Sequence, residues 1–444
     1  MGNNGSHKDK AAETRDRPAA EPAEVDAGRL SRRSVLKGAA ALLPAGALAG
    51  IGACSRPRGE PAGSGVARGG SHHVAVVGAG AFGGWTALHL LRKGARVTLM
   101  DTWGPGNSRA SSGGETRVIR HTYGPDRIYV DWVNRALQLW RQNGERWHRQ
   151  LYHQTGVLWM VQEYEDYERS ALPNLTAAGV DYEQFSADGV AHRYPQINPE
   201  GIRWAIYEKD AGYLFARRAC EAVLEGFLAE GGEFRKARVE PGAFRGGELE
   251  GIRLSDGDTL TADRYVFACG PWLGGLFPEV LGDLILPTRQ EVFYFGTRPG
   301  DSQYGEGAFP VWADHGERLW YGIPGAERRG FKVADDSLGG EIDPTTAERE
   351  PSDEGLRRAR NYMEFRFPGM KGAPLLEARV CQYENSPDGH FIIDRHPEAE
   401  NLWLVGGGSG HGFKHGPALG EHVAERVLGE KPLEPFFALD RFSA

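Results

Sequence analysis

Three glycines, Gly78, Gly80 and Gly83, have the G-x-G-x-x-G spacing of a phosphate-binding turn. Gly78 permits the tight turn, Gly80 lets the backbone approach a pyrophosphate, and Gly83 lets a helix pack closely against a strand. Asp101 follows about 20 residues later, where an acid can accept a hydrogen bond from a ribose hydroxyl. These four residues predict a dinucleotide site, without indicating which dinucleotide binds.

The elements expected around the glycines fit that chemistry. A strand is predicted over residues 74–77, then the glycine turn and a helix, then a second strand over residues 97–100 that ends at Asp101. Free N–H groups at the start of the helix would face the phosphates. The glycine pattern alone would be weak evidence, because it also occurs in ordinary turns. The order strand, turn, helix, strand and acid favours a nucleotide-binding βαβ unit.

Size and charge restrict the classes of function. With 444 residues, the chain can form two or three domains. Its 52 Lys and Arg against 60 Asp and Glu give a formal charge of −8, so no basic surface for nucleic acid is indicated. Its 14 histidines show no metal-ligand spacing, and its four cysteines are too widely separated to suggest a disulfide framework. We therefore expect no metal site and no nucleic-acid partner.

The N-terminal part of the chain has the pattern of an export signal. Residues 1–30 are polar, without periodicity, and are predicted to be disordered. Arg32 and Arg33 then precede a short, weakly apolar run over residues 38–53, which is typical of the twin-arginine route. The alternative is a basic patch beside a core helix. We expect a protein exported by the twin-arginine machinery to the periplasm, the outside of the cell or the outer face of the membrane.

A processing site is also expected in this segment. The residues ending at Cys54 resemble a lipoprotein signal, which would leave Cys54 acylated, and cleavage nearby without a lipid is the alternative. Residues 55–71 are rich in Gly, Pro, Arg and Ser and indicate a flexible tether. Residues 1–71 are therefore assigned to a disordered start, signal and linker.

Later segments return to the first sheet. Residues 265–269 are predicted to form a buried strand that enters a turn at Gly270. Residues 402–405 form a second such strand, which runs into the glycine-rich turn 406–412 and then a helix from about Pro417. Residues 290–385 hold strand-like pieces that favour an antiparallel sheet.

These patterns predict an α/β fold of the two-domain α+β kind. A Rossmann-like nucleotide-binding domain is expected, together with a discontinuous substrate domain built on an antiparallel sheet. The first domain would comprise residues 72–154, 212–284 and 387–444, and the second residues 155–211 and 285–386.

Seven segments, taken in order, resemble the monomeric sarcosine oxidase and N-methyltryptophan oxidase group of the D-amino-acid-oxidase-like flavoproteins. They span about residues 73 to 428 and comprise GAGAFG (78–83), ETRVIRHTYG (115–124), ACGPW (268–272), GFK (330–332), VCQY (380–383), HFIIDRHP (390–397) and SGHGFK (409–414). The resemblance implies an FAD-dependent, monomeric oxidase acting on the C–N bond of an amino acid or N-methyl amino acid. A hydride would pass to flavin N5, and dioxygen would reoxidise the flavin to give hydrogen peroxide.

The resemblance assigns the reaction to a few residues. Arg120 and Lys414 match a clamp for the substrate carboxylate, with pairing of Arg120 to a structural acid and a surface role for Lys414 as the alternatives. Lys332 matches the lysine that promotes reaction with dioxygen, with a solvated loop lysine as the alternative. Tyr321 and Thr116 are expected near the substrate or the flavin ring.

The resemblance also assigns cofactor contacts. Cys381 matches the cysteine that forms a thioether to the flavin, the alternative being a small core residue. Arg117, Val239 and His411 match further flavin or adenine contacts, and Gly270 and Gly410 are expected to form walls of the FAD site.

Three departures from the family pattern concern the substrate. Ser112-Gly113-Gly114 stands where a pair of histidines is usual, and Asp336 replaces an active-site histidine four residues after Lys332. Gly408-Ser409 replaces a common Gly-Phe pair. An acid near the amine would favour a cationic or larger polar substrate. Two rival functions stay open, a flavin dehydrogenase using an envelope electron acceptor and a flavin-containing binding lipoprotein without turnover.

Overall fold

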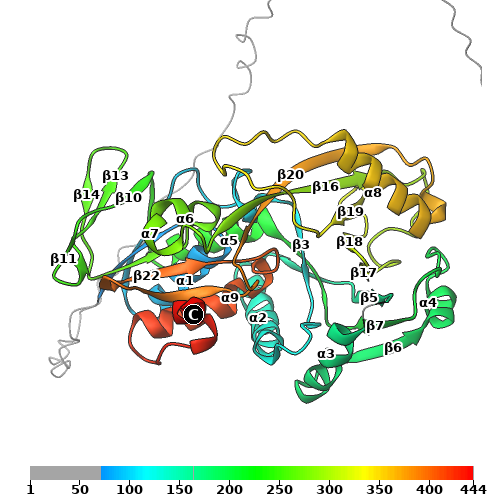
Figure 1. Cartoon of the computed structure of the whole chain (residues 1–444), viewed down its shortest axis with the longest axis horizontal. Coiled ribbons are helices and arrows are strands. Elements are labelled where there is room, and N and C mark those ends of the chain that lie inside the picture. Colours follow the sequence, from blue (N-terminus) through cyan, green and yellow to red (C-terminus); the bar gives the residue numbers. More distant parts are fainter. Residues whose placement is uncertain (1–71, 164, 444) are drawn as a thin grey trace, which may run out of the picture. The chain divides into compact units, whose positions relative to one another are not determined.

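The computed structural model describes residues 72–163 and 165–443, and the following sections concern this part of the chain (Figure 1). The predicted twin-arginine signal and the lipid site at Cys54 lie outside the described residues. Within the described ranges no helix has the length and apolar character needed to cross a membrane. No group of three or more His, Cys, Asp and Glu side chains in those ranges could hold a metal ion.

A six-stranded sheet carries the glycine turn. Its strand order is β21-β22-β15-β1-β2-β9, and all neighbours are parallel except β21 and β22. Both strands predicted to return to the sheet do so, since β15 pairs with β1 and β22 pairs with β15. The strands are β1 (His73–Val77), β2 (Arg96–Asp101), β9 (Glu233–Lys236), β15 (Arg264–Phe267), β21 (Ile392–His396) and β22 (Ala399–Gly406).

Four helices from separate segments of the sequence pack together beside this sheet. In α1 (Ala81–Arg92), every residue from Ala81 to Leu90 is buried, so the helix has no broad polar face. It packs closely on α9 (Gly416–Val427), because a Cβ at Gly420 would lie 2.5 Å from the Trp85 carbonyl carbon. The other two helices of this group are α2 (Arg127–Arg146) and α5 (Ala216–Ala229).

An eight-stranded sheet forms the second large layer, with the order β20-β16-β19-β18-β17-β5-β7-β6. The prediction of an antiparallel sheet is correct for every pair except β5 and β17, which are parallel. That pair joins two segments far apart in sequence, so no hairpin turn sets its direction. The strands are β5 (Val157–Val161), β6 (Tyr182–Ser186), β7 (Trp204–Glu208), β16 (Leu286–Phe295), β17 (Val311–His315), β18 (Leu319–Ile323), β19 (Phe331–Asp335) and β20 (Leu375–Asn385). The predicted domain boundaries stay a prediction.

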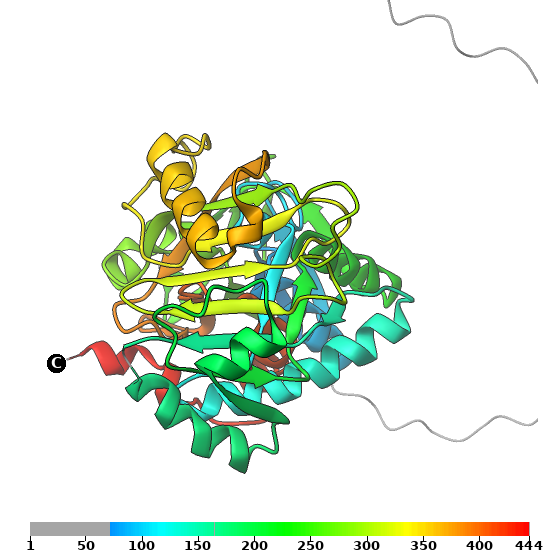
Figure 2. The ribbon, with the colours of Figure 1, turned by 90° about the vertical axis from the view of Figure 1, so that its right-hand side faces the viewer.

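Helix α8 (Asp353–Arg366) packs on one face of this sheet (Figure 2). Its last residue, Arg366, forms an ion pair with Asp314 of β17 at 2.8 Å, with side chains 1% and 0% exposed. Tyr362 also donates a hydrogen bond to the Asp314 carboxylate. A buried charge pair is tolerable when its remaining polar atoms are satisfied, as they are here. The opposite face of the sheet is left to line a cavity.

Smaller elements connect the two sheets. A three-stranded sheet has the order β3-β8-β4 and follows directly on the loop after β2. It contains β3 (Thr116–Ile119), β4 (Tyr152–Gln154) and β8 (Gly212–Phe215). The remaining elements are α3 (Asp166–Ala177), α4 (Ala187–Arg193), α6 (Leu273–Leu276), α7 (Pro278–Leu281), β10 (Val239–Pro241), β11 (Phe244–Arg245), β12 (Glu248–Leu249), β13 (Ile252–Leu254) and β14 (Thr259–Leu260).

Candidate active site

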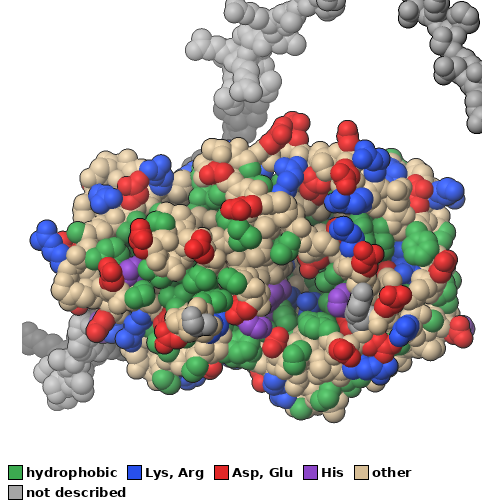
Figure 3. All heavy atoms as spheres, in the orientation of Figure 1, with side chains coloured by type: hydrophobic (Ala, Val, Ile, Leu, Met, Phe, Trp, Pro, Cys, Tyr) green, Lys and Arg blue, Asp and Glu red, His purple; other side chains and the backbone are tan. Residues whose placement is uncertain are grey.

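Two adjoining cavities occupy the space between the sheets. The first has a volume of about 1100 Å³ and lies at the carboxyl ends of β1, β2 and β15. The second, of about 430 Å³, lies under the eight-stranded sheet. Ala110, Arg117, Tyr383, Gly410 and Phe413 line both, so one bound molecule could extend through the two. The space-filling view shows a hollow with histidine and basic side chains inside it (Figure 3).

The glycine turn forms one end of the first cavity. Gly78 has φ +103°, and a Cβ there would lie 2.2 Å from the Ala268 carbonyl oxygen, so both conformation and space require glycine. Gly80 and the first residues of α1 line the cavity, which places the helix N-terminus at its wall. Gly83 lines neither cavity, and a Cβ there would lie 1.9 Å from the Gly78 oxygen, so it serves the packing of helix on turn.

Asp101, Val239 and Gly270 line the same cavity farther along. The Asp101 carboxylate accepts hydrogen bonds from the Ala79 N–H at 2.9 Å and the Gly104 N–H at 2.7 Å. It therefore also holds the glycine turn in place, a contact that the sequence pattern does not reveal.

Glu384 provides a direct test of whether a cofactor fits. The carboxyl group is wedged between Gly270 and Gly408, where added Cβ atoms would lie 2.6 and 2.8 Å from its oxygens. One oxygen accepts the Gly408 N–H at 3.2 Å, and the buried Oε2 has no partner in the described part of the chain. Burial raises the pKa of Glu384 to about 7. A group bearing hydroxyl or N–H donors would satisfy this atom, as a dinucleotide can. Sequence reasoning missed Glu384.

The two predicted carboxylate-binding cations line the second cavity. The Arg120 guanidinium lies 4.6 Å from the Tyr123 ring and 4.5 Å from the Trp159 ring and donates to the Thr122 carbonyl. The Lys414 ammonium donates to the Tyr123 hydroxyl at 2.7 Å and to the His411 carbonyl at 2.8 Å. Within residues 72–163 and 165–443 neither forms an ion pair with a carboxylate. Burial and the nearby Arg120 lower the pKa of Lys414, and a bound anion would favour its charged form.

The structure contradicts the two alternatives, pairing of Arg120 with a structural acid and a surface role for Lys414. Lys414 is 4% exposed and so is not a surface lysine. The nearby acid, Glu208, is taken up by other groups, since it accepts hydrogen bonds from the His121 and Thr122 N–H groups and side chains. Burial opposes ionisation, but these bonds hold the pKa of Glu208 below its usual value. Glu208 therefore fixes the segment that follows Arg120.

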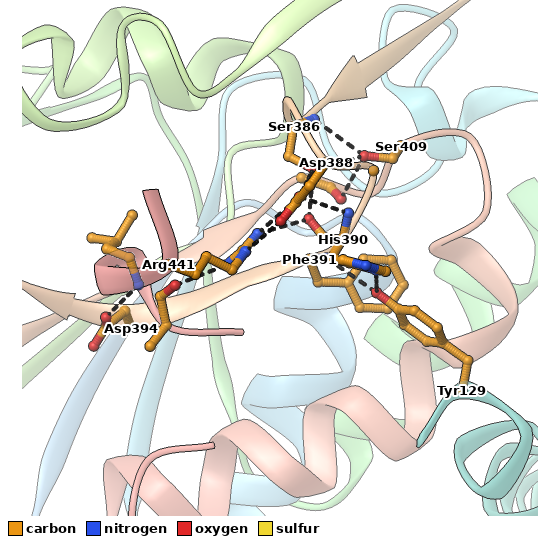
Figure 4. A network of polar contacts seen from close by, with 12 residues as sticks. Tyr129, Ser386, Asp388, His390, Phe391, Asp394, Ser409 and Arg441 are labelled. Carbon is orange, nitrogen blue, oxygen red and sulfur yellow. Dashed lines mark hydrogen bonds and ion pairs between the residues drawn. The ribbon is translucent and has the colours of Figure 1, made fainter. Parts of the chain in front are cut away.

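The glycine-rich turn 406–412 is held by hydrogen bonds to the loop that follows β20 (Figure 4). Ser409 has φ +43° and accepts a hydrogen bond from the Ser386 N–H at 3.1 Å. Asp388 in the same supporting loop pairs with Arg441 near the C-terminal end at 2.7 Å. His411 reaches the Gly389 carbonyl at 3.0 Å, and burial lowers the pKa of His411, so the ring is neutral. His411 and Gly410 thus line the second cavity from a fixed turn.

Cys381 and Arg117 lie side by side on the second cavity. The Cys381 sulfur is 3.4 Å from an Arg117 nitrogen, and Arg117 also donates to the Ser111 and Thr116 carbonyls. No carboxylate in the described residues pairs with Arg117. The Cys381 thiol therefore faces the cavity beside a guanidinium that no carboxylate of the described residues pairs with.

Lys332 and Thr116 lie behind the cavity wall. Lys332 is 2% exposed, so the alternative of a solvated loop lysine is wrong. Its ammonium donates to the Thr116 carbonyl at 3.3 Å and lies 5.1 Å from the Tyr321 ring. Burial and the nearby Arg117 lower the pKa of Lys332 to about 7. Neither Lys332 nor Thr116 lines either cavity, whereas Tyr321 lines the second.

The second cavity is strongly cationic. Its lining contains one carboxylate, Asp336, against six arginines and Lys414, and two of the arginines, Arg217 and Arg379, pair with Glu115. Two arginines that sequence reasoning missed, Arg109 and Arg349, also lack an ion-pair partner in the described ranges. The Nε and one Nη of Arg349 are buried without any hydrogen bond. The cavity therefore fits a negatively charged molecule.

Of the two glycines that replace the family's histidines, Gly113 is required by packing against backbone, and Gly114 lies against the end of the Arg117 side chain. A Cβ at Gly113 would lie 1.9 Å from the Asn107 carbonyl oxygen, and one at Gly114 would lie 2.4 Å from an Arg117 nitrogen. A histidine at either position would therefore displace the turn or the guanidinium.

Comparison with known proteins agrees with this site. A family model described as FAD dependent oxidoreductase matches residues 73–426. The monomeric sarcosine oxidase of Bacillus sp. (strain NS-129) is 32% identical over 366 residues, covering 79% of this chain and 92% of that protein. The N-methyl-L-tryptophan oxidase of Salmonella agona (strain SL483) is 28% identical over 384 residues, covering 84% of this chain and 99% of that protein.

A solved structure supports the fold. The L-proline dehydrogenase from P.horikoshii has a TM-score of 0.73 at 22% identity and covers 84% of this chain and 98% of that chain. The matched family segment contains the glycine turn, both cavities and every site residue predicted from the sequence. The chain belongs to the FAD-dependent oxidoreductase family, with FAD as its dinucleotide cofactor.

Proposed function

We propose that the protein oxidises the C–N bond of an amino acid or N-methyl amino acid and delivers the electrons to dioxygen. The observation that carries this proposal is the pair Arg120 and Lys414, two enclosed cations without carboxylate partners in the described ranges, on a cavity adjoining the dinucleotide cavity. Relatives named as oxidases of sarcosine and N-methyl-L-tryptophan support the same class of donor.

The residues of the second cavity would hold and orient the substrate. Arg120 offers a planar fork of donors and Lys414 a point charge, which together fix a carboxylate. Tyr321 lines the same cavity and can donate a hydrogen bond to the carboxylate. When bound, FAD supplies the two-electron chemistry, accepting a hydride from the carbon beside nitrogen and passing electrons to dioxygen.

A substrate panel tests the proposal. Primary, N-methyl and cationic amino acids are added anaerobically to the flavoprotein, and at least one should bleach the flavin absorbance. The same compound in air should give about one hydrogen peroxide per turnover. Bleaching without peroxide would favour the dehydrogenase that uses an envelope acceptor. A flavin that no compound in the panel reduces would favour the binding lipoprotein.

We assign acceleration of the dioxygen reaction to Lys332. Its buried ammonium would stabilise the negative charge that develops as dioxygen is reduced. The Lys332→Met variant should reoxidise about 100-fold more slowly, with anaerobic reduction within about threefold of the wild type. Stopped-flow absorbance measures both steps. The exposed Lys371→Met variant is the control, and equal reoxidation by Lys332→Met and wild type would exclude the role.

We assign covalent attachment of FAD to Cys381. Its sulfur faces the second cavity beside Arg117, whereas Cys269 lines only the first cavity. After acid precipitation, wild type and Cys269→Ser should keep the yellow flavin in the pellet, and Cys381→Ser should release it to the supernatant. Release of all flavin from the wild type would rule out the thioether.

Export and assembly complete the proposal. We propose export by the twin-arginine route from Arg32 and Arg33, with Cys54 as the candidate lipid site and a monomer as the working unit. Replacing both arginines by lysine should retain the protein in the cytoplasm on cell fractionation. Export that survives this double substitution would contradict the assignment.

A further inference from the structure

Asp336 is the carboxylate on the wall of the second cavity, and it is held in place on both sides. It follows directly after β19, and its N–H donates to the Leu319 carbonyl of β18 at 2.8 Å. The Tyr383 hydroxyl of β20 donates to one carboxylate oxygen, Oδ1, at 2.6 Å. The residue is half-buried and lines the cavity. Neither a lysine nor an arginine of residues 72–163 and 165–443 forms an ion pair with it.

The other carboxylate oxygen, Oδ2, makes no hydrogen bond within the described chain. It is therefore available to a ligand, whereas Oδ1 is occupied by Tyr383. Burial raises the pKa of Asp336, and Arg120 and Lys414 act in the opposite direction, so both cations lie within electrostatic reach. One acid facing two cations matches an amino acid in water, whose carboxylate and ammonium are borne by the same carbon.

The proposed reaction requires that the ammonium lose a proton. The nitrogen lone pair must be free before the adjacent carbon can release a hydride, and an amino acid arrives protonated at neutral pH. Some group facing the cavity must accept that proton. A protonated nitrogen cannot be bound productively by Arg120 or Lys414, since like charges repel.

The other groups around Asp336 are already committed. Tyr383 donates its proton to Asp336, and both ring nitrogens of His411 are in contact, with the Tyr123 hydroxyl and the Gly389 carbonyl. Lys332 donates to the Thr116 carbonyl and lines neither cavity. The three remaining titratable neighbours are unsuitable, because Tyr321 is a neutral phenol, Cys381 lies against Arg117, and Asp335 pairs with Arg318 at 2.8 Å.

We propose that Asp336 is a catalytic residue that recognises the amino group of the substrate. Oδ2 binds the ammonium and accepts one proton from it: an N–H bond breaks, an O–H bond forms, and no electrons are transferred. The neutral amine remains beside the carboxylic acid, and the proton later leaves to solvent through the open cavity. The site thus selects zwitterionic amino acids rather than simple amines. This assignment rests on the proposed function.

The test compares Asp336→Asn with Asp335→Asn, the neighbouring acid that pairs with an exposed arginine. For the amino acid that reduces the wild type fastest, Asp336→Asn should lower the second-order rate of anaerobic flavin reduction about 100-fold at pH 7. The loss should shrink to about threefold at pH 10, because the free amine then reaches the site already deprotonated. Asp335→Asn should match the wild type throughout.

The pH profile gives the sign of the effect. The wild-type rate should fall as pH drops through the raised pKa of Asp336, since the carboxylate must be ionised to accept a proton. In Asp336→Asn the rate should no longer change at the pKa of Asp336. It should instead rise tenfold per pH unit up to the pKa of the amine. Binding of propionate, which has a carboxylate and no amine, should stay within about threefold, showing that the carboxylate clamp is intact.

The outcomes separate the two proposals. If no amino acid reduces the wild-type flavin, the proposed function fails, and the role of Asp336 fails with it. If the wild type is reduced and Asp336→Asn keeps its rate and its acid limb, the proposed function stands and Asp336 is not the proton acceptor. Loss of propionate binding in Asp336→Asn would show a structural role and would also overturn the assignment.

Discussion

Unpaired positive charge inside the protein is the constraint that the rest of the site satisfies. Arg117, Arg120, Lys332 and Lys414 lie inside the described chain without carboxylate partners. An enclosed charge costs several kcal/mol unless it is hydrogen-bonded. Here the hydrogen-bond acceptors are the backbone carbonyls of Thr116, Ser111, Thr122 and His411 and the hydroxyl of Tyr123. The carbonyls of Ser111, Thr122 and His411 lie outside the α-helices and strands, and Thr116 is the first residue of β3, so the loops are part of the site.

This arrangement leaves the charge available to ligands. Carbonyl oxygens stabilise a cation without cancelling it, whereas a paired carboxylate would neutralise it. In the proposed reaction a carboxylate substrate, a reduced flavin and a partly reduced dioxygen would all be anionic, and each would gain from the same excess of positive charge. Asp336 is the exception among the lining residues, and its position beside Tyr383 makes one oxygen of that carboxylate specific for a positively charged group.

Sequence reasoning was most successful where the pattern is local. The unit from β1 to β2, the helix α9 and the returning strands β15 and β22 follow from periodicity and glycine turns. The polar helices α3 and α8 and the parallel pairing of β5 with β17 depend on tertiary contacts that no local pattern records.

The site residues also divide into those that the sequence could predict and those that it could not. The glycine positions could be predicted from spacing, and Arg120, Lys414 and Cys381 from the resemblance, and all of these except Gly83 line a cavity. Glu384 could not be found, because its significance lies in two glycines, Gly270 and Gly408, that come from other strands. Asp336 was visible as a departure from the family, but its partner Tyr383 lies 47 residues away and meets it through the sheet.

The strand order of the six-stranded sheet has a consequence for biosynthesis. β22 is among the last elements of the chain, yet it lies between β21 and β15 in the interior of that sheet. The sheet therefore cannot close on the ribosome while the chain is still emerging, and pairings between distant segments make folding slow. The two walls of the first cavity, one after β1 and one after β22, therefore come together only after β22 has been synthesised. A complete site for the cofactor consequently forms late in synthesis.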